Sequence, residues 1–198
     1  MKRRDCVILG GSAAVLWPAL VHAQFFPKTL IDRAIEARSA GDIAKDNEIV
    51  VKVNKIMADV GSVSASTEIY EQRLLITGLF DDKPTYDKFE KSVRAVKDVK
   101  TLYWHASYMS KADQEAEKKK GTMIGWAAGL EMTTKAQGRI VGTKNVADVN
   151  YRIAGDAFGN LYLLGLARSA DEKKLALARV KDGEGVKKVV DYVVVRPK

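Results

Sequence analysis

The sequence predicts an α+β protein made of two tandem α-β-β-α-β sandwiches, each a three-stranded sheet covered by two helices. The first observation is a repeat: Leu74-Leu75-Ile76-Thr77-Gly78-Leu79 returns 87 residues later as Leu161-Tyr162-Leu163-Leu164-Gly165-Leu166. The second is that the same offset relates Val99 to Val186, so each copy reads strand, glycine, charged helix and valine-rich strand. The third is length, because 198 residues can hold two units of about 70 residues each.

Residues 1–23 have the composition of an export signal. A basic start (Lys2–Arg4) precedes an apolar run (Val7–Leu20) and a cleavage site before Gln24. The alternative is an uncleaved membrane anchor, but the run is shorter than the ~20 residues that a spanning helix needs, and it contains Pro18. The paired arginines leave both Sec and twin-arginine export open. We therefore expect a periplasmic protein without a lipoprotein cysteine.

The mature chain is expected to be basic and poor in reactive side chains. The full chain has 33 Lys and Arg, 25 Asp and Glu and a net charge of +8, and loss of residues 1–23 would leave +6. The sole cysteine is Cys6, and His105 is the only histidine after the signal. These facts exclude a disulfide, a thiol nucleophile and a cysteine metal site in the mature chain. We expect no catalytic residues, metal or cofactor. Export argues against nucleic-acid binding unless the signal is retained.

The first unit is predicted to span residues 42–110, after a lead-in helix over residues 24–41 that Gly41 ends. Apolar residues at spacings of three and four predict a helix that begins at Asp42 or Asp46 and ends at Gly61. Apolar and polar residues then alternate, as in a half-buried strand. The remaining elements are a strand from Val63, a turn at 71–73, a strand over 74–80, a helix that opens at Asp81–Pro84, and a strand over 99–109.

The second unit is predicted to span residues 122–198, after a charged linker over 111–121 that is helical or a short ordered segment. Its first helix, over 122–141, contains Gly125, Gly129 and Gly138, which weaken helical propensity. Phe158-Gly159-Asn160 is typical of a turn. The other elements are strands over 146–154, 161–167 and 186–195, and a helix over 170–181.

The repeated pattern resembles the BON domain, named for bacterial osmotic-stress and nodulation proteins. In the first unit the pattern falls on Asp46, Ile49, Val53, Leu75, Gly78 and Val99; in the second, on Gly159, Leu163, Gly165, Gly185, Val186 and Val189. The resemblance covers roughly residues 42–198, and Asp98 stands where the pattern usually has glycine. It implies a periplasmic module, without catalytic residues, that binds phospholipid and supports the envelope under stress. Family members with a lipid anchor carry a cysteine where this chain has Gln24.

The candidate membrane-binding residues are Trp126, Leu130, Lys135 and Arg139. Apolar side chains beside cations suit contact with anionic headgroups, because burial of apolar area and charge attraction act together. The expected partner is anionic phospholipid or the inner leaflet of the outer membrane. The alternative is that Trp126 and Leu130 pack in the domain core or between the units, and that Lys118–Lys120 are a solvated charge run.

Three further features have structural and functional alternatives. Alternation turns Tyr103 and His105 to one face of their strand and Trp104 to the other. This aromatic segment could bind a partner, or it could pack in the sheet core or in a contact between the two units. Gly78 and Gly165 are expected to let a helix approach the sheet closely. The acidic pairs Asp81-Asp82 and Asp171-Glu172 are expected to cap helices. A protein-interaction adaptor for an envelope assembly is the alternative function.

Overall fold

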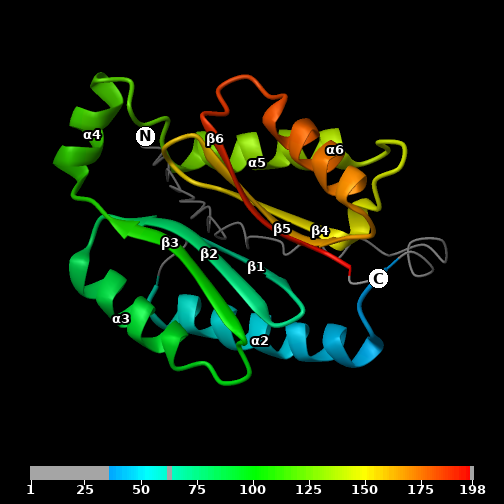
Figure 1. Cartoon of the computed structure of the whole chain (residues 1–198). Coiled ribbons are helices and arrows are strands. Elements are labelled where there is room, and N and C mark those ends of the chain that lie inside the picture. The colour runs from blue at the N-terminus through cyan, green and yellow to red at the C-terminus, as the bar shows by residue number, and fades with distance from the viewer. Residues whose placement is uncertain (1–35, 62–63, 197–198) are drawn as a thin grey trace, which may run out of the picture.

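The computed structural model describes residues 36–61 and 64–196. The predicted signal and residues 24–35 of the predicted lead-in lie outside the described residues. The described chain forms two α-β-β-α-β units joined by one helix, which confirms the predicted fold class (Figure 1).

Each element of the first unit has its counterpart in the second. The first unit consists of α2 (Ala40–Asp59), β1 (Ala65–Tyr70), β2 (Arg73–Phe80), α3 (Lys83–Arg94) and β3 (Thr101–Tyr108). The charged linker forms α4 (Lys111–Lys119). The second unit consists of α5 (Trp126–Ile140), a 3-10 turn (Asp148–Asn150), β4 (Tyr151–Gly155), β5 (Asn160–Ala167), α6 (Ala170–Lys181) and β6 (Lys188–Val195).

The two sheets share one topology, with strand orders β1-β2-β3 and β4-β5-β6. The first pair of each sheet is antiparallel and the second is parallel, so β2 and β5 are the central strands. Gly78 pairs with Ala65 and Ala106, and Gly165 pairs with Tyr151 and Val193. The repeated glycines therefore occupy equivalent places, as the sequence repeat predicts.

The molecule has four layers, with the two sheets facing one another and the helices outside (Figure 1). Helices α2 and α3 cover the first sheet around Phe89 and Val93, and α5 and α6 cover the second around Ile140 and Val180. A third cluster lies between the sheets and includes side chains of both units. Its fully or partly buried members are Ala37, Tyr70, Leu75, Tyr103, Ala154, Tyr162, Leu164, Leu166, Val190 and Tyr192.

Helix α2 begins earlier than predicted. The Ser39 side chain accepts a hydrogen bond from the Asp42 N–H, so Ser39 is the N-cap and Gly41 lies in the first turn instead of ending a preceding helix. Asp46, the other predicted cap, is buried inside the helix and binds the β1–β2 turn. A serine followed three residues later by an acid was the signal that should have placed the start here.

One strand and one helix of the second unit begin later in the sequence than predicted. The strand expected from residue 146 begins only at Tyr151, because residues 148–150 form a 3-10 turn. The helix expected from residue 122 begins at Trp126, because Gly125 has φ 91° and the Ile124 and Gly125 N–H groups donate to the Ala157 carbonyl oxygen. These hydrogen bonds hold the start of α5 against the β4–β5 turn.

The prediction that Gly78 and Gly165 let a helix approach the sheet closely is wrong, because the segments next to them are not covering helices. A Cβ on Gly78 would lie 2.7 Å from the Ser64 carbonyl oxygen, and one on Gly165 would lie 2.2 Å from that of Asn150. Both neighbours are backbone that leads into the paired strand, and neither belongs to an α-helix that covers the sheet. The close approach of a helix to the sheet occurs at Gly129 of α5, where a Cβ would lie 2.2 Å from the Asp156 carbonyl oxygen.

Candidate functional site

Helix α5 carries all four candidate membrane-binding residues. Gly129, Met132, Ala136 and Ile140 are its buried side. Trp126 and Leu130, four residues apart, are half-buried on one border of its exposed face. Lys135 lies about two and a half turns after Trp126, on the other border.

The two candidate cations of α5 differ in their surroundings. The Lys135 side chain is 66% exposed and forms an ion pair with Glu131 at 2.6 Å. Arg139 donates from Nε to the Arg179 carbonyl oxygen at 2.9 Å and from Nη2 to that of Val180 at 3.0 Å. Arg139 therefore satisfies the last carbonyl groups of α6, a structural role that sequence reasoning missed.

Trp126 also belongs to a small apolar cluster at the end of the molecule. Leu79, Met123 and Ala157 are buried there, with Met109, Trp126 and Phe158 partly buried around them. The cluster joins the end of β2 to the β4–β5 turn. Trp126 is half-buried, so one portion of its side chain packs in this cluster and another reaches the surface.

Two lysines at the end of α4 are paired with glutamates of that helix. Lys118 and Lys120 form ion pairs with Glu115 and Glu117 at 2.7 and 2.8 Å. Hydrogen bonds from these lysines lower the pKa of both glutamates. Helix α4 has no buried residue. This arrangement agrees with the predicted solvated charge run.

The aromatic segment of β3 lies between the two units. Tyr103 stacks on Tyr192 with ring centroids 3.9 Å apart, and His105 lies 4.1 Å from the Tyr162 ring. His105 Nε2 is 2.8 Å from the Tyr192 hydroxyl oxygen. Trp104 points the other way, into the core under α3. The alternation is confirmed, and the contact between the units is the alternative that the structure supports.

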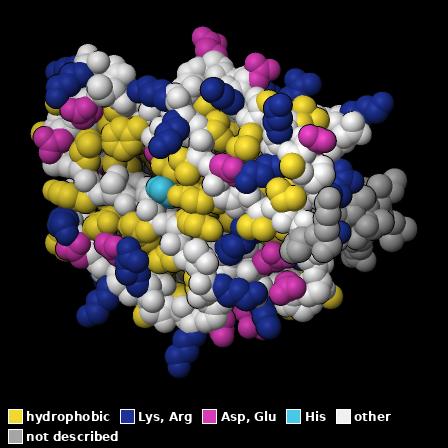
Figure 2. Space-filling view, viewed as in Figure 1, with side chains coloured by type: hydrophobic (Ala, Val, Ile, Leu, Met, Phe, Trp, Pro, Cys, Tyr) yellow, Lys and Arg dark blue, Asp and Glu magenta, His cyan; other side chains and the backbone are white. Residues whose placement is uncertain are grey.

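His105 and Tyr192 stand 87 residues apart, so equivalent positions of the two copies meet. Figure 2 shows apolar side chains gathered along this seam around the histidine, with lysines and acids scattered on either side. Burial lowers the pKa of His105; nearby Asp156 opposes this effect and Lys188 adds to it. The lowered pKa favours the neutral imidazole, which packs on Tyr162 and lies within hydrogen-bonding distance of Tyr192.

A buried polar network close to α2 was not foreseen from the sequence. Asp46 accepts hydrogen bonds from the Glu71 and Gln72 N–H groups at 2.9 and 2.7 Å, and an ion pair joins it to Arg38 at 3.0 Å. Glu71 and Gln72 both have positive φ, which is costly for such residues. The carboxylate holds this strained turn in place, and a polar residue on the apolar side of a predicted helix was the available signal.

Charged groups also lie between the sheets. Glu68 of β1 and Arg152 of β4 both point to this layer, as the alternation about Ile69 and Ala154 requires. Burial raises the pKa of Glu68 to about 7, although the positive charge of Arg152 opposes the shift. Burial likewise lowers the pKa of Arg152. Arg152 donates to the Val149 and Tyr151 carbonyl oxygens at 3.0 and 2.7 Å.

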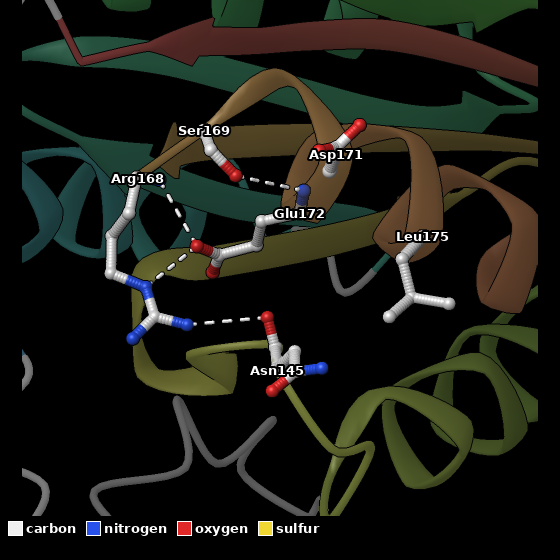
Figure 3. A pocket seen from close by; sticks show the side chains of 6 residues that line it. All are labelled: Asn145, Arg168, Ser169, Asp171, Glu172 and Leu175. Atoms are coloured by element: carbon white, nitrogen blue, oxygen red, sulfur yellow. Dashed lines mark hydrogen bonds and ion pairs between the residues drawn. The ribbon is translucent and has the colours of Figure 1, made fainter.

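A shallow pocket of about 430 Å³ lies at the start of α6 (Figure 3). Ser169 is the N-cap of α6, accepting from the Glu172 N–H, so the predicted capping by Asp171-Glu172 is wrong, although both acids lie in the first turn, where the predicted interaction with the helix dipole is favourable. The buried Glu172 carboxylate instead accepts hydrogen bonds from the Ala147 and Arg168 N–H groups and from Arg168 Nε, at 2.8, 3.1 and 2.6 Å. The other pair behaves as predicted, because Asp82 caps α3 by accepting from the Thr85 N–H.

These bonds engage the Arg168 and Glu172 side chains that line the pocket. Figure 3 shows the Arg168 guanidinium held between Glu172 and the Asn145 carbonyl oxygen. Over residues 36–61 and 64–196, no three His, Cys, Asp or Glu side chains come together as a potential metal site. In the same ranges, no helix has both the length and the apolar character required to cross a membrane.

No protein-family model matches the chain. A protein of Anaplasma centrale known as an uncharacterized protein in the gshII 5' region is 28% identical over 151 residues, which is 75% of this chain and 93% of that protein. Two solved structures of CdsD, a structural protein of the type III secretion system of Chlamydia trachomatis, align with 76% of this chain and with 93% and 98% of theirs. Both are 12% identical to this chain with a TM-score of 0.31, and similarity at that level establishes neither a common fold nor a common role.

Proposed function

We propose that this chain is a non-enzymatic periplasmic protein that binds anionic phospholipid, at the inner leaflet of the outer membrane, and supports envelope integrity. The observation that carries the proposal is the exposed face of α5, bordered by half-buried Trp126 and Leu130 on one side and by Lys135 on the other. The signal-like residues 1–23 and the BON resemblance support the location.

The chemistry of this face suits the interface of a bilayer. The partly exposed indole and leucyl side chains can lose further apolar surface, worth about 25 cal/mol per Å². Lys135 sits where its ammonium group can reach headgroups, and a basic side chain near an anionic surface contributes about 1 kcal/mol. The ion pair with Glu131 reduces that contribution. Arg139 would act mainly by holding α6 beside α5.

The test is vesicle flotation of the mature chain. Vesicles of phosphatidylglycerol and phosphatidylcholine should carry the protein, and pure phosphatidylcholine vesicles should carry much less. Trp126→Ala should reduce recovery most strongly, and Lys135→Glu should reduce it on the anionic vesicles. Ionic strength near 1 M, where the Debye length is about 3 Å, should release the protein.

Two matched variants control for nonspecific effects. Val51→Ala shortens a side chain that is 68% exposed on α2, and Lys91→Glu reverses an exposed charge on α3. Both should float like the parent chain. Equal recovery with neutral and anionic vesicles, unchanged by Trp126→Ala and Lys135→Glu, would rule out membrane binding through α5.

A protein-interaction adaptor is the second candidate function. The observation that favours it is that β3 is an edge strand of the first sheet, where a partner could bind. This strand belongs to a different unit from α5. The two proposals thus place their contacts on separate elements, and variants of one surface should leave the other unchanged.

A further inference from the structure

The strand order leaves β3 and β6 at the edges of their sheets. Both lie toward the viewer in Figure 1, and each runs parallel to the central strand of its unit. They are repeat-equivalent strands of 8 residues each. A strand edge presents N–H and C=O groups that can pair with another extended chain, so the two edges can be compared directly.

The edge of β6 is closed by the side chain of Asp191, from the strand itself, and by that of Lys173, from α6. The Val193 N–H donates to the Asp191 carboxylate at 2.9 Å, and the Val193 carbonyl oxygen accepts from Lys173 Nζ at 2.6 Å. Lys173 and Asp191 also form an ion pair at 2.8 Å. The outward backbone groups of Val193 are therefore occupied, and a second chain could not pair there without breaking these bonds.

The equivalent edge of β3 lacks this closure. Tyr86 and Trp104 stand 87 residues before Lys173 and Asp191, and the Trp104 indole N–H donates to the Tyr86 hydroxyl at 3.1 Å. These two side chains form a hydrogen bond with one another and not with the backbone at the edge of β3. Ala106, the counterpart of Val193, has no side-chain hydrogen bond to its backbone among the described residues.

Alternation along β3 shows which backbone groups face outward. The Met109 N–H donates to the Phe80 carbonyl oxygen across the β2–β3 pair. In β6 the N–H and C=O groups of Val193, the counterpart of Ala106, bond to side chains on the outer edge and so point away from the central strand. Because β3 and β6 are repeat-equivalent and successive residues of a strand alternate in direction, the N–H and C=O groups of Trp104 and Ala106 point away from β2. They are available to an added strand over the middle of β3.

The side chains around this edge are aromatic and framed by cations. The Arg94 guanidinium carbon lies 5.3 Å from the centre of the Trp104 ring, and Lys83 Nζ lies 5.5 Å from that of Tyr86. Tyr108, at the end of the strand, is 40% exposed. Residues 83–100 contain six basic and three acidic residues, so the helix and loop beside the edge are net positive.

We propose that the edge of β3 binds an extended acidic segment of another protein, which adds to the first sheet as a fourth strand. Backbone hydrogen bonds supply affinity in this mode, and alternate side chains supply specificity. Side chains on the α3 side of the added strand meet the cation-flanked aromatic pair, which favours apolar residues alternating with acids. A second copy of the chain fits poorly, because it would bring two positive edges together. The site is separate from the proposed membrane surface.

The test uses a fluorescein-labelled peptide of 8 residues, the length of β3, in which valine and glutamate alternate. Fluorescence anisotropy with the mature chain should give saturable binding. Backbone amide NMR shifts should concentrate on β3 and leave β6 unchanged. The same peptide with alternate backbone nitrogens methylated should not bind, because methylation removes the donors that strand addition needs.

Charge variants distinguish binding at the edge of β3 from nonspecific attraction of the acidic peptide to a basic protein. Arg94 is exposed, so Arg94→Glu should preserve folding and weaken binding by about fivefold to tenfold. Lys174→Glu, an exposed residue on α6, is the matched control and should bind like the parent. A peptide that alternates valine and lysine should bind at least about tenfold more weakly.

Several results would overturn the proposal. They are no saturable binding of the acidic peptide, equal binding of its methylated form, or amide shifts centred on β6 or α5. Concentration-dependent dimerisation through β3, detected by light scattering and the same amide shifts, would assign the edge to a second copy instead. Vesicle flotation of Arg94→Glu should match that of the parent. The peptide-binding proposal and the membrane-binding proposal can therefore be refuted independently.

Discussion

Helix α5 contains two glycines whose replacement by alanine should have opposite effects on stability. At Gly138 a Cβ would meet no atom within 4 Å. Gly138→Ala should therefore stabilise the helix by about 1 kcal/mol, the usual difference in propensity. For a chain of this size that corresponds to a rise in Tm of about 2–4 °C.

At Gly129 the same change meets the Asp156 carbonyl oxygen at 2.2 Å. The Asp156 backbone cannot move away easily, because its carboxylate accepts hydrogen bonds from Phe158, Asn160 and Tyr162, at 2.8 to 2.9 Å. Helix α5 must move instead, by about 1 Å, to reach ordinary contact distance. Overpacking of this kind costs about 3 kcal/mol at the upper end, so the net loss after the gain in propensity is about 2 kcal/mol.

The assay is urea and thermal unfolding of the two variants, followed by circular dichroism. Gly138→Ala should unfold about 6–12 °C above Gly129→Ala, a gap of about 3 kcal/mol. Because helix, substitution and added methyl group are the same, the gap isolates the contact with the β4–β5 turn. If Gly129→Ala proves as stable as Gly138→Ala, the close packing of α5 on this turn is refuted.

Three further predictions concern buried and capping carboxylates. Glu172→Gln should destabilise the fold by about 2 kcal/mol in urea unfolding, since it weakens the bonds from Ala147 and Arg168, whereas exposed Asp171→Asn should have little effect. Asp82→Ala should cost about 1 kcal/mol through loss of the α3 cap, in the same assay. The pKa of Glu68 is raised to about 7 in the folded state, so the fold binds this proton more tightly than the unfolded chain, and stability should fall as pH rises from about 4.5 to 7. Glu68→Gln should remove that slope and be more stable than the parent at pH 8, by up to about 3 kcal/mol; an unchanged slope would contradict the assignment.

Local patterns predicted the elements of this fold well. The repeat around Gly78 and Gly165 placed both central strands, because short apolar strands bounded by turns and helices leave few alternatives. Element ends were less predictable. The start of α5 at Trp126 depends on hydrogen bonds from Ile124 and Gly125 to the distant Ala157, and no local pattern encodes those bonds.

The candidate surfaces were only partly predictable, for a similar reason. Helical spacing alone puts Trp126 and Lys135 on different borders of α5. The hydrogen bonds of Arg139 to the last turn of α6 require the helix pair to be packed first. The closed edge of β6 likewise depends on Lys173 reaching across from a helix, which is a tertiary contact between segments twenty residues apart.

Arg73 has a consequence for how the chain folds. Its side chain leaves the first unit and donates to the Tyr192 and Gly165 carbonyl oxygens of the second, both at 2.9 Å. Tyr70 crosses the same boundary to reach the Asn150 side chain. Either half expressed alone would lose these hydrogen bonds and expose the apolar sheet face that the other half covers, a large loss for a fold whose net stability is only about 5–15 kcal/mol. The duplicated halves should therefore melt together in one cooperative transition, as a single physical unit.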